Sequence, residues 1–555
     1  MEGIIYEKDE KFVIERLLKG ELDYIDCGNE VFEADLFRYI KARKYLMEIS
    51  ETYPTPRKKE EVPLWLFNSS RISMCLHGVN SFDQYGFVIR CGGMMAALGP
   101  KVGTKAVHPE TGNTTLHCPG FNNKNDYDRE TPCDQDYLRK LARDTLAERL
   151  FAWNNQDVAR VFKKHKVFDR NGIFIGDGSY LFVPDNEAYE HSVVMLFDKH
   201  NHPVDPKEVP PGKMADYQWR RCYKMVSLLH TNPEGDFFIV AAVKVLPGNA
   251  HECPVLYDLV EEFTGAVGDG VIKRLILDRG FIDGEKIGWC KLEHGIDVLI
   301  PVKRSMDLYQ DALELLGQVD KDFEPWQVPE LHVPPPSAPK PERIEKREAS
   351  RQKTLEKKKQ KEPPPLPKDT VIAREVVKIS ELRSWQGCPV PVNLALCTDT
   401  YADGHFDLWM LLDTDPTKTS SDSRNDYHLR VQIEERHRQF KGFSDLTNFT
   451  SRAFSLIANQ VVFLLLTYNF IQIFLRSQSK KKALSNKPIP NIRRQLLPSI
   501  PYVIVYCQQR VAFLNPLHFT QIILNLEGEA KKKAQAKVNK LRIEFMESLR
   551  YPRPP

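Results

Sequence analysis

The stretch from Tyr427 to Lys441, YHLRVQIEERHRQFK, gathers side chains that can act on a phosphodiester. If it forms a helix with about 100° per residue, five of its polar residues share an arc of roughly 80°. These residues are Tyr427, Arg430, Glu434, His437 and Lys441. A carboxylate beside an Arg, a Lys and a Tyr hydroxyl suits a site where a metal ion meets a phosphate. The alternative is a solvated charged helix, which is the commoner fate of a charge run.

A seam of apolar residues beside this polar stripe would position it. Leu429, Ile433 and Phe440 project into the adjoining sector of the predicted helix. Such a seam docks a helix onto a sheet, so we expect the polar stripe to face the edge of that sheet.

Two acidic residues on predicted strands are the partners that Glu434 needs. Residues 172–183 predict a buried strand interrupted by Asp177, and residues 271–280 predict a very apolar strand ending in Asp278. Three carboxylates suffice to hold two Mg²⁺ (or Mn²⁺) ions for in-line attack on phosphorus. We therefore select Asp177, Asp278 and Glu434 as catalytic, metal-binding residues. Structural alternatives exist, because Asp177 between two glycines suits a turn and Asp278 suits a cap between a strand and a helix.

The elements around these carboxylates predict an α/β fold. After the strand at 172–183, residues 191–200 and 235–247 predict two more strands, and we expect the three to form an antiparallel meander. Residues 253–267 then predict a helix, 271–280 a strand, 282–295 a helix and 296–304 a fifth strand. This succession is the ribonuclease H-like order.

The spacing of the polar residues resembles that of a known family. Tyr427, Arg430, Glu434 and Lys441 resemble the YREK signature of insertion-sequence transposases of the DDE superfamily. GDGSYLFV is similar to that family's first-Asp strand, and LILDRGF to its second-Asp motif. The resemblance implies that Tyr427 and Arg430 hold phosphates near the cleaved end and that Lys441 contacts the DNA backbone. We add His437 as an auxiliary DNA-binding residue, with Glu435 as a second candidate auxiliary.

One aromatic residue extends the resemblance. LWMLLDTDP resembles the strand on which hairpin-forming relatives carry a Trp that traps a flipped base, and Trp409 stands at that place. Stacking of a base on an aromatic ring is worth about 1 to 3 kcal/mol. The alternative is that Trp409 is a core residue of a β segment.

Composition limits the class of protein. The chain has 555 residues and a net charge of only +3, so total charge does not indicate nucleic-acid binding, although Lys and Arg cluster at several places. The eleven cysteines include no CxxC pair, which indicates reduced thiols in the cytoplasm. His117, Cys118 and Cys133 suggest a zinc site but lack a fourth ligand. No Walker-type loop is present, so we expect no nucleotide cofactor.

Two features bear on membranes. The first residues, MEGIIYEKDEKF, are acidic and lack the basic and apolar regions of a signal peptide. Residues 453–475 approach membrane-spanning length but contain two Asn and two Gln, so we interpret them as a buried core helix. We expect no membrane association.

The chain divides into five predicted regions. The prediction places a mainly helical, DNA-end-binding region at 1–165, the first part of the ribonuclease H-like core at 166–302, and a partly β insertion with a Pro- and Lys-rich charged segment (341–361) at 303–425. The second part of the core, with the catalytic Glu helix and the buried helix, follows at 426–480, and a small α+β region for dimerisation or DNA contact at 481–555.

Together these features predict an insertion-sequence transposase. We expect a prokaryotic, cytoplasmic and nucleoid-associated protein that binds terminal inverted repeats and target DNA, acts as a homodimer in the synaptic complex, and cuts and joins DNA through hairpin ends. Two rival functions remain. One is a nuclease on the same fold without strand transfer, and the other is a non-catalytic DNA-binding protein derived from a transposase.

Overall fold

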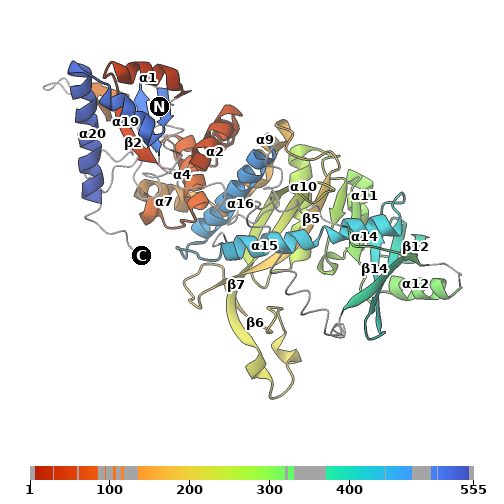
Figure 1. Ribbon diagram of the computed structural model, residues 1–555. Coiled ribbons are helices and arrows are strands. Elements are labelled where there is room, and N and C mark those ends of the chain that lie inside the picture. Colours follow the sequence, from red (N-terminus) through yellow and green to blue (C-terminus); the bar gives the residue numbers. More distant parts are fainter. Residues whose placement is uncertain are drawn as a thin grey trace, which may run out of the picture.

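The computed structural model describes most of the chain, namely residues 7–28, 31–58, 62–85, 94, 104–107, 114–117, 135–318, 323–329, 370–443, 446–477, 502–508 and 510–548. Its largest feature is a ten-stranded mixed sheet, which confirms the predicted α/β class (Figure 1). The charged segment 341–361, and Cys118 and Cys133 of the suggested zinc site, lie outside the described residues.

The first strands of the sheet form an antiparallel meander. Strand β5 (Ile173–Val183) pairs with β7 (Gln218–Thr231), which pairs in turn with β8 (Phe238–Pro247). The short strand β6 (Val193–Phe197) pairs with the first residues of β7, and the two project from the molecule as an arm (Figure 1). The strand predicted at 191–200 is confirmed as β6, but its predicted place in the meander was wrong, because β7, which was not predicted, lies between β5 and β8. The first four residues of β7, Gln218 to Arg221, are exposed or half-buried, whereas the remaining ten are buried.

Two parallel strands complete the core. Strand β9 (Arg274–Ile276) pairs with both β5 and β10 (Asp297–Pro301). The crossover helices are α10 (Glu252–Val267) and α11 (Gly284–His294). The spatial order is β8-β7-β5-β9-β10, with β7 antiparallel to its neighbours.

The insertion continues the same sheet. Strands β12 (Val371–Leu382), β13 (Val392–Tyr401) and β14 (Phe406–Asp413) are antiparallel, and β14 pairs with the free edge of β10. Helix α12 (Asp307–Gln318) and the short strand β11 (Glu324–Pro325) precede them. The prediction of a partly β insertion is confirmed for these residues, and its strands enlarge the core sheet.

The helix predicted from Tyr427 to Lys441 is in fact two helices. Helix α14 (Ser420–His428) ends before Leu429, and helix α15 (Val431–Phe443) begins after Arg430. The amides of Leu429, Arg430 and Ile433 bond to carbonyls three residues earlier, so the chain turns more tightly there than in an α-helix. The expected apolar seam is confirmed, since Leu429, Ile433 and Phe440 are all buried.

Helix α16 (Phe454–Ser477) lies between the sheet and the N-terminal helices (Figure 1). Its Asn469 amide bonds to both backbone groups of Val240 on β8, at 2.8 Å each, and its Asn459 accepts from Arg71 at 2.8 Å. Within the described residues α16 alone is long and apolar enough to cross a membrane, but 83% of its apolar window is buried inside the protein. The polar residues thus anchor a core helix, as predicted.

The N-terminal region is mainly helical, as predicted. Several of its helices surround α16, and the phenyl ring of Phe474 contacts both Phe32 and Tyr39 edge-on. Its helices are α2 (Val31–Ala42), α3 (Tyr45–Glu51), α4 (Leu64–His77), α7 (Gln135–Asp144), α8 (Ala147–Ala152) and α9 (Ala159–Lys164). A π-helical turn, Trp153–Val158, joins α8 to α9, and β3 (Thr104–Val107) pairs with β4 (Thr114–His117).

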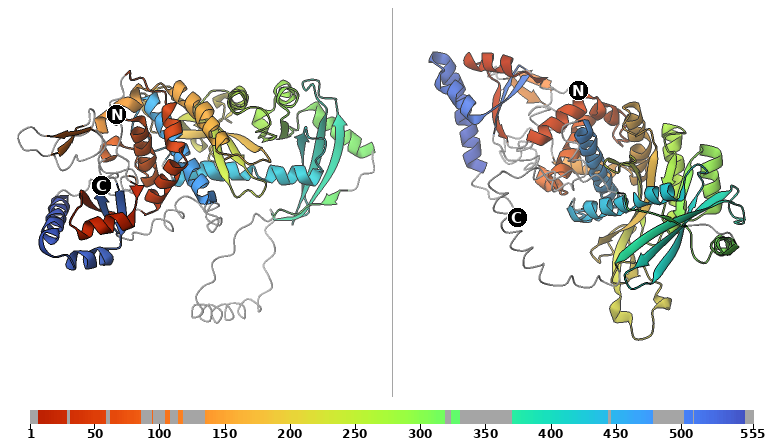
Figure 2. Two further views of the ribbon diagram at one scale, coloured as in Figure 1. Left: turned by 90° about the horizontal axis from the view of Figure 1, so that it is seen from above. Right: turned by 45° about the vertical axis from the view of Figure 1, so that its right-hand side comes forward.

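The first and last described residues fold together into a small terminal unit. Its sheet has the order β1-β16-β15-β2, and its helices lie beside it at one end of the molecule (Figure 2). The strands are β1 (Glu7–Lys8), β2 (Tyr24–Gly28), β15 (Tyr502–Cys507) and β16 (Arg510–Leu514), and the helices α1 (Glu10–Leu18), α19 (Pro516–Leu524) and α20 (Gly528–Ser548). The predicted regions 1–165 and 481–555 therefore share one sheet, a connection that the sequence did not indicate.

Candidate active site

Asp177 lies within strand β5, not in a turn. Gly176 is required by close packing, because a Cβ there would lie 2.7 Å from side-chain atoms of Leu256 on α10 and Leu277. Successive residues of a strand point to opposite faces, so Asp177 points away from α10 and towards α15. The glycine that made Asp177 look like a turn residue instead allows α10 to approach the strand.

Asp278 lies just beyond the end of β9, the strand next to β5. One of its carboxylate oxygens accepts the amide of Arg279 at 2.7 Å and caps the short 3₁₀ helix Arg279–Phe281. The other oxygen lies 3.2 Å from the guanidinium of Arg430. Asp278 therefore caps the short helix, as the structural alternative predicted, and also belongs to the cluster around Arg430.

Glu434 belongs to the first turn of α15, and Arg430 lies between the three carboxylates. The guanidinium of Arg430 is 2.7 Å from Glu434, 3.2 Å from Asp278 and 3.8 Å from Asp177. Over the described part of the chain, no three acidic, His or Cys side chains come close enough together to hold one metal ion. The structure thus brings all three predicted carboxylates around a single organic cation.

Burial and charge shape the protonation of this cluster. Burial raises the pKa of Asp177 to about 7, and the negative charges of Asp278 and Glu434 act in the same direction, whereas Arg430 opposes the rise. Burial alone would lower the pKa of Arg430, but the surrounding carboxylates keep its pKa above the ordinary value. Arg430 is therefore permanently charged, and Asp177 titrates near neutral pH.

His437 and Lys441 turn towards the sheet. His437 is buried, its Nε2 lies 2.9 Å from the Ser227 hydroxyl and its Nδ1 lies 3.6 Å from Asp177. Burial lowers the pKa of His437 to about 3, so its imidazole is neutral at pH 7. Lys441 donates to the Ser179 hydroxyl at 2.6 Å, and burial lowers its pKa to about 8. His437, predicted to bind DNA, is thus buried between the Ser227 hydroxyl and the Asp177 carboxylate.

Trp409 and Tyr427 lie together, and the charges of Asp278 and Glu434 act on Tyr427. Their ring centroids are 5.9 Å apart, and the indole nitrogen of Trp409 donates to Asp399 at 3.2 Å. The guanidinium of Arg424 covers the Trp409 ring at 5.3 Å and the Trp326 ring at 4.3 Å. Trp409 is only partly buried, so one part of its surface faces solvent.

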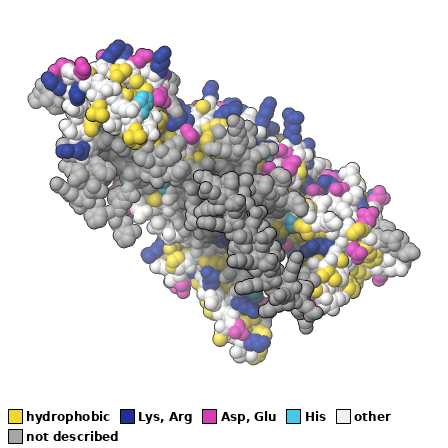
Figure 3. All heavy atoms as spheres, in the orientation of Figure 1, with side chains coloured by type: hydrophobic (Ala, Val, Ile, Leu, Met, Phe, Trp, Pro, Cys, Tyr) yellow, Lys and Arg dark blue, Asp and Glu magenta, His cyan; other side chains and the backbone are white. Residues whose placement is uncertain are grey.

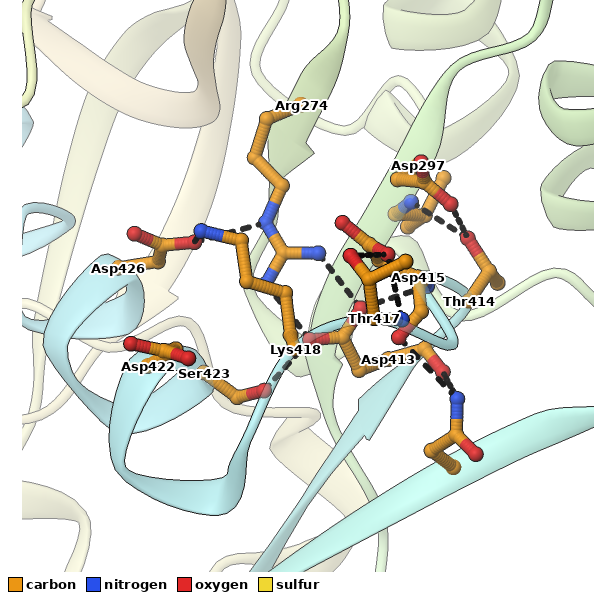
Figure 4. Close-up of polar contacts among 12 residues, drawn as sticks. Arg274, Asp297, Asp413, Thr414, Asp415, Thr417, Lys418, Asp422, Ser423 and Asp426 are labelled. Carbon is orange, nitrogen blue, oxygen red and sulfur yellow. Dashed lines mark hydrogen bonds and ion pairs between the residues drawn. The ribbon is translucent and has the colours of Figure 1, made fainter. Parts of the chain in front are cut away.

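A second arginine fixes the elements that carry the site. Arg274 on β9 makes two bonds to Asp413 at the end of β14, at 2.5 and 2.6 Å, and its Nε lies 3.1 Å from Asp426 on α14 (Figure 4). Ser423 of α14 donates to the same Asp413 at 2.6 Å. These contacts join β9, β14 and α14. Arg274 and Asp413 are almost fully buried, and α14 directly precedes Arg430 and Glu434 in the sequence.

Several residues of this environment were not predicted from the sequence. Ser179 lies two positions after Asp177, so the period of a strand places both on one face, and this signal was present in the sequence. Ser227 lies directly opposite Asp177 in the pairing of β5 with β7. It could not be found without recognising β7. Nothing local marks Arg274, since its partners are more than a hundred residues away in sequence.

The donor set fits divalent metal ions of the Mg²⁺ type. All three groups are carboxylates, which are the hard oxygen ligands that Mg²⁺ and Mn²⁺ prefer. They already surround one positive charge, the Arg430 guanidinium, within 2.7 to 3.8 Å. The site is therefore suited to cationic partners in both charge and chemistry.

Fold and site together define a class. A sheet of the order β8-β7-β5-β9-β10, with carboxylates on the first strand, after the fourth and on a late helix, is that of ribonuclease H-like proteins. The sequence profile described as "Transposase DDE domain" matches residues 191–470, half of the chain, and the protein belongs to this family of DDE-superfamily transposases. The match includes Asp278 and Glu434 and begins after Asp177. No curated protein matches the chain.

Proposed function

We propose that the protein is the transposase of an insertion sequence, which binds terminal inverted repeats and catalyses metal-dependent cleavage and strand transfer. The observation that carries this proposal is the meeting of Asp177, Asp278 and Glu434 around Arg430 from three distant parts of the chain. Family membership supports a DNA substrate. The identity of the ends, the homodimer in the synaptic complex and action in the prokaryotic cytoplasm belong to the proposal.

The residues divide the work by their chemistry. Asp177, Asp278 and Glu434 would hold two Mg²⁺ or Mn²⁺ ions, which would supply Lewis-acid stabilisation of the attacking and leaving oxygens when bound. Arg430 pairs with a phosphate next to the cleaved bond, because a guanidinium matches phosphate geometry. Tyr427 donates its hydroxyl to the same strand, and Lys441, charged at pH 7, contacts the backbone. His437 keeps Asp177 oriented.

Trp409 gives the proposal its hairpin step. A ring clamped by Arg424 and Asp399 is rigid, and a rigid aromatic surface can receive a base turned out of the duplex. Turning out one base relieves the bend at a hairpin end. Trp409→Ala is expected to reduce hairpin formation while the first nick persists, as measured on denaturing gels with an end-labelled duplex.

Cleavage of DNA tests the proposal directly. The substrate is a labelled duplex that carries the sequences flanking the coding region, incubated with Mg²⁺ or with EDTA. We expect cuts at the element's end that require Mg²⁺ and are absent with Asp278→Asn. The control is Asp269→Asn, which changes an exposed carboxylate paired with His294 and should leave cleavage intact. Specific binding by the wild type without any cut would favour the non-catalytic rival.

Strand joining separates transposase from nuclease. Pre-cut ends with a 3′ hydroxyl are incubated with plasmid DNA and Mg²⁺, and joined products are counted. A transposase joins the ends to the plasmid, whereas a nuclease releases hydrolysed products alone. Wild-type cleavage without joining would therefore leave the fold assignment in place and replace the proposed reaction.

Glu434→Gln tests whether this residue is chemical or structural. The variant keeps the size of the side chain and removes its charge, so we expect end binding to persist and cleavage to be lost. The matched control is the neighbouring Glu435→Gln, which breaks a pair with Arg438 at 2.7 Å on the same helix. A gel-shift assay and the cleavage assay measure the two activities, and equal loss of both would make Glu434 structural.

A further inference from the structure

The Arg430 guanidinium occupies the centre of the three carboxylates. It is the group that all three share, at 2.7, 3.2 and 3.8 Å. Like charges held this close repel one another, and a guanidinium among them offsets part of that repulsion. A divalent cation would need the same oxygens, so Arg430 and metal ions compete for one set of ligands.

The contacts of Arg430 leave it able to change partners. Its side chain is 14% exposed, and Asp278 and Glu434 are 37% and 55% exposed, so one side of the cluster is open to solvent. Its Nε is buried and meets no hydrogen-bond acceptor within the described residues. The residue also lies in the tight turn between α14 and α15, outside both helices. A phosphate could satisfy the guanidinium more completely than the carboxylates do.

We infer that Arg430 makes metal uptake depend on DNA. In the DNA-free protein its guanidinium neutralises Asp177, Asp278 and Glu434 and weakens their hold on divalent ions. When a DNA end enters the site, a phosphate draws Arg430 away and frees the carboxylates for metal. This inference rests on the proposed function and adds an order of events, with DNA first and metal second.

The dependence must act in both directions. Two ligands that assist each other through one group do so by equal factors, so bound metal must tighten the protein's hold on the DNA end as much as DNA tightens its hold on metal. Couplings of this kind commonly amount to between about 5-fold and 150-fold in affinity. An effect of that size is accessible to direct titration and needs no catalytic turnover.

The first test measures Mn²⁺ binding to the DNA-free protein. Electron paramagnetic resonance of the free ion reports how much Mn²⁺ remains unbound. Arg430→Gln removes the charge and is expected to tighten Mn²⁺ binding about tenfold or more relative to wild type. Arg430→Lys keeps a positive charge, so its Mn²⁺ affinity should lie between those of wild type and Arg430→Gln. The matched control, Arg438→Gln, removes one positive charge from the outer face of the same helix and should leave Mn²⁺ affinity near that of wild type. Circular dichroism verifies that each variant is folded.

The second test adds a duplex that carries the sequences flanking the coding region. Mn²⁺ binding to wild type should tighten when the duplex is present, while binding to Arg430→Gln should change little. Asp278→Asn in the Arg430→Gln background should remove the gain, which ties it to the carboxylates.

The outcomes separate this inference from the proposed function. Equal Mn²⁺ affinity of wild type and Arg430→Gln, with binding that still requires Asp278, overturns the role of Arg430 and leaves the metal site standing. Mn²⁺ binding that ignores Asp278 in both proteins overturns the proposed function together with the inference. An equal gain in Arg438→Gln would reduce the effect to net charge and also overturn the inference.

Discussion

Arg274 contacts α14 through Asp426, and Arg430 follows α14 in the chain; each contacts more than one carboxylate, yet their surroundings differ. Arg274 and Asp413 are 5% and 3% exposed, whereas the carboxylates of Glu434 and Asp278 around Arg430 are 55% and 37% exposed. The buried pair cannot exchange its partner for water or phosphate without a large desolvation cost. The exposed cluster around Arg430 can exchange its partners at a lower desolvation cost. The same arginine–carboxylate pairing is thus a fixed contact at Arg274 and Asp413, which we call the fixed joint, and a replaceable contact at Arg430.

The largest expected effect is on the fixed joint. Arg274→Gln leaves Asp413 buried without its cation, so we expect a loss of about 3 to 5 kcal/mol in the free energy of unfolding, measured by urea denaturation. The control is Arg304→Gln, which breaks an exposed Arg–Asp pair with Asp407 and should stay within about 1 kcal/mol of wild type. Similar small losses in both variants would contradict the distinction between fixed and replaceable pairs.

A smaller effect is expected from the hydroxyl that completes the joint. Ser423→Ala removes a donor to the buried Asp413 carboxylate, which should cost about 1.5 to 3 kcal/mol in the same denaturation assay. Thr417→Val, which loses the hydroxyl bond to the exposed side of Asp415, is the comparison and should cost less. A larger loss in free energy of unfolding for Thr417→Val than for Ser423→Ala would contradict the role of Ser423 in stabilising the buried Asp413 carboxylate.

The smallest effect concerns pH and the open cluster. The folded pKa of Asp177, about 7, lies above its ordinary 3.8, so its contribution to stability is full below about pH 4 and is lost as the pH rises through 7. Asp177→Asn carries no such charge and should melt a few degrees higher than wild type at pH 8, with a smaller gain at pH 5. Calorimetry in metal-free buffer measures both, and a gain confined to pH 5 would reverse the sign.

The described part of the face shown in Figure 3 gives no comparable contrast in charge. Figure 3 shows Lys and Arg side chains interspersed with Asp and Glu over the described part of this face, including the terminal unit and the projecting β6 arm. This mixture agrees with the net charge of +3. The charges that carry the proposed function are those of Arg430 and its three carboxylates.

The sequence determined much of the site. Polar and apolar residues three and four apart predicted the seam of α15, and a carboxylate in each of two apolar runs predicted Asp177 and Asp278. Such patterns are local, because the periodicity of a helix or strand depends on residues that are close together in the sequence. The sequence also predicted the α/β class and a partly β insertion before Glu434, whereas the pairing of that insertion with the core sheet through β14 and β10 came from the structure.

Tertiary structure decided the rest. The break at Leu429 and Arg430 interrupts a run of residues whose spacing fits one continuous helix, so no local pattern indicated it. Strand β7 was hidden by its exposed start, and the shared sheet of the terminal unit pairs residues almost five hundred positions apart. Above all, the sequence placed Arg430 beside Glu434, but only the packing of β5, β9 and α15 put its charge between three carboxylates.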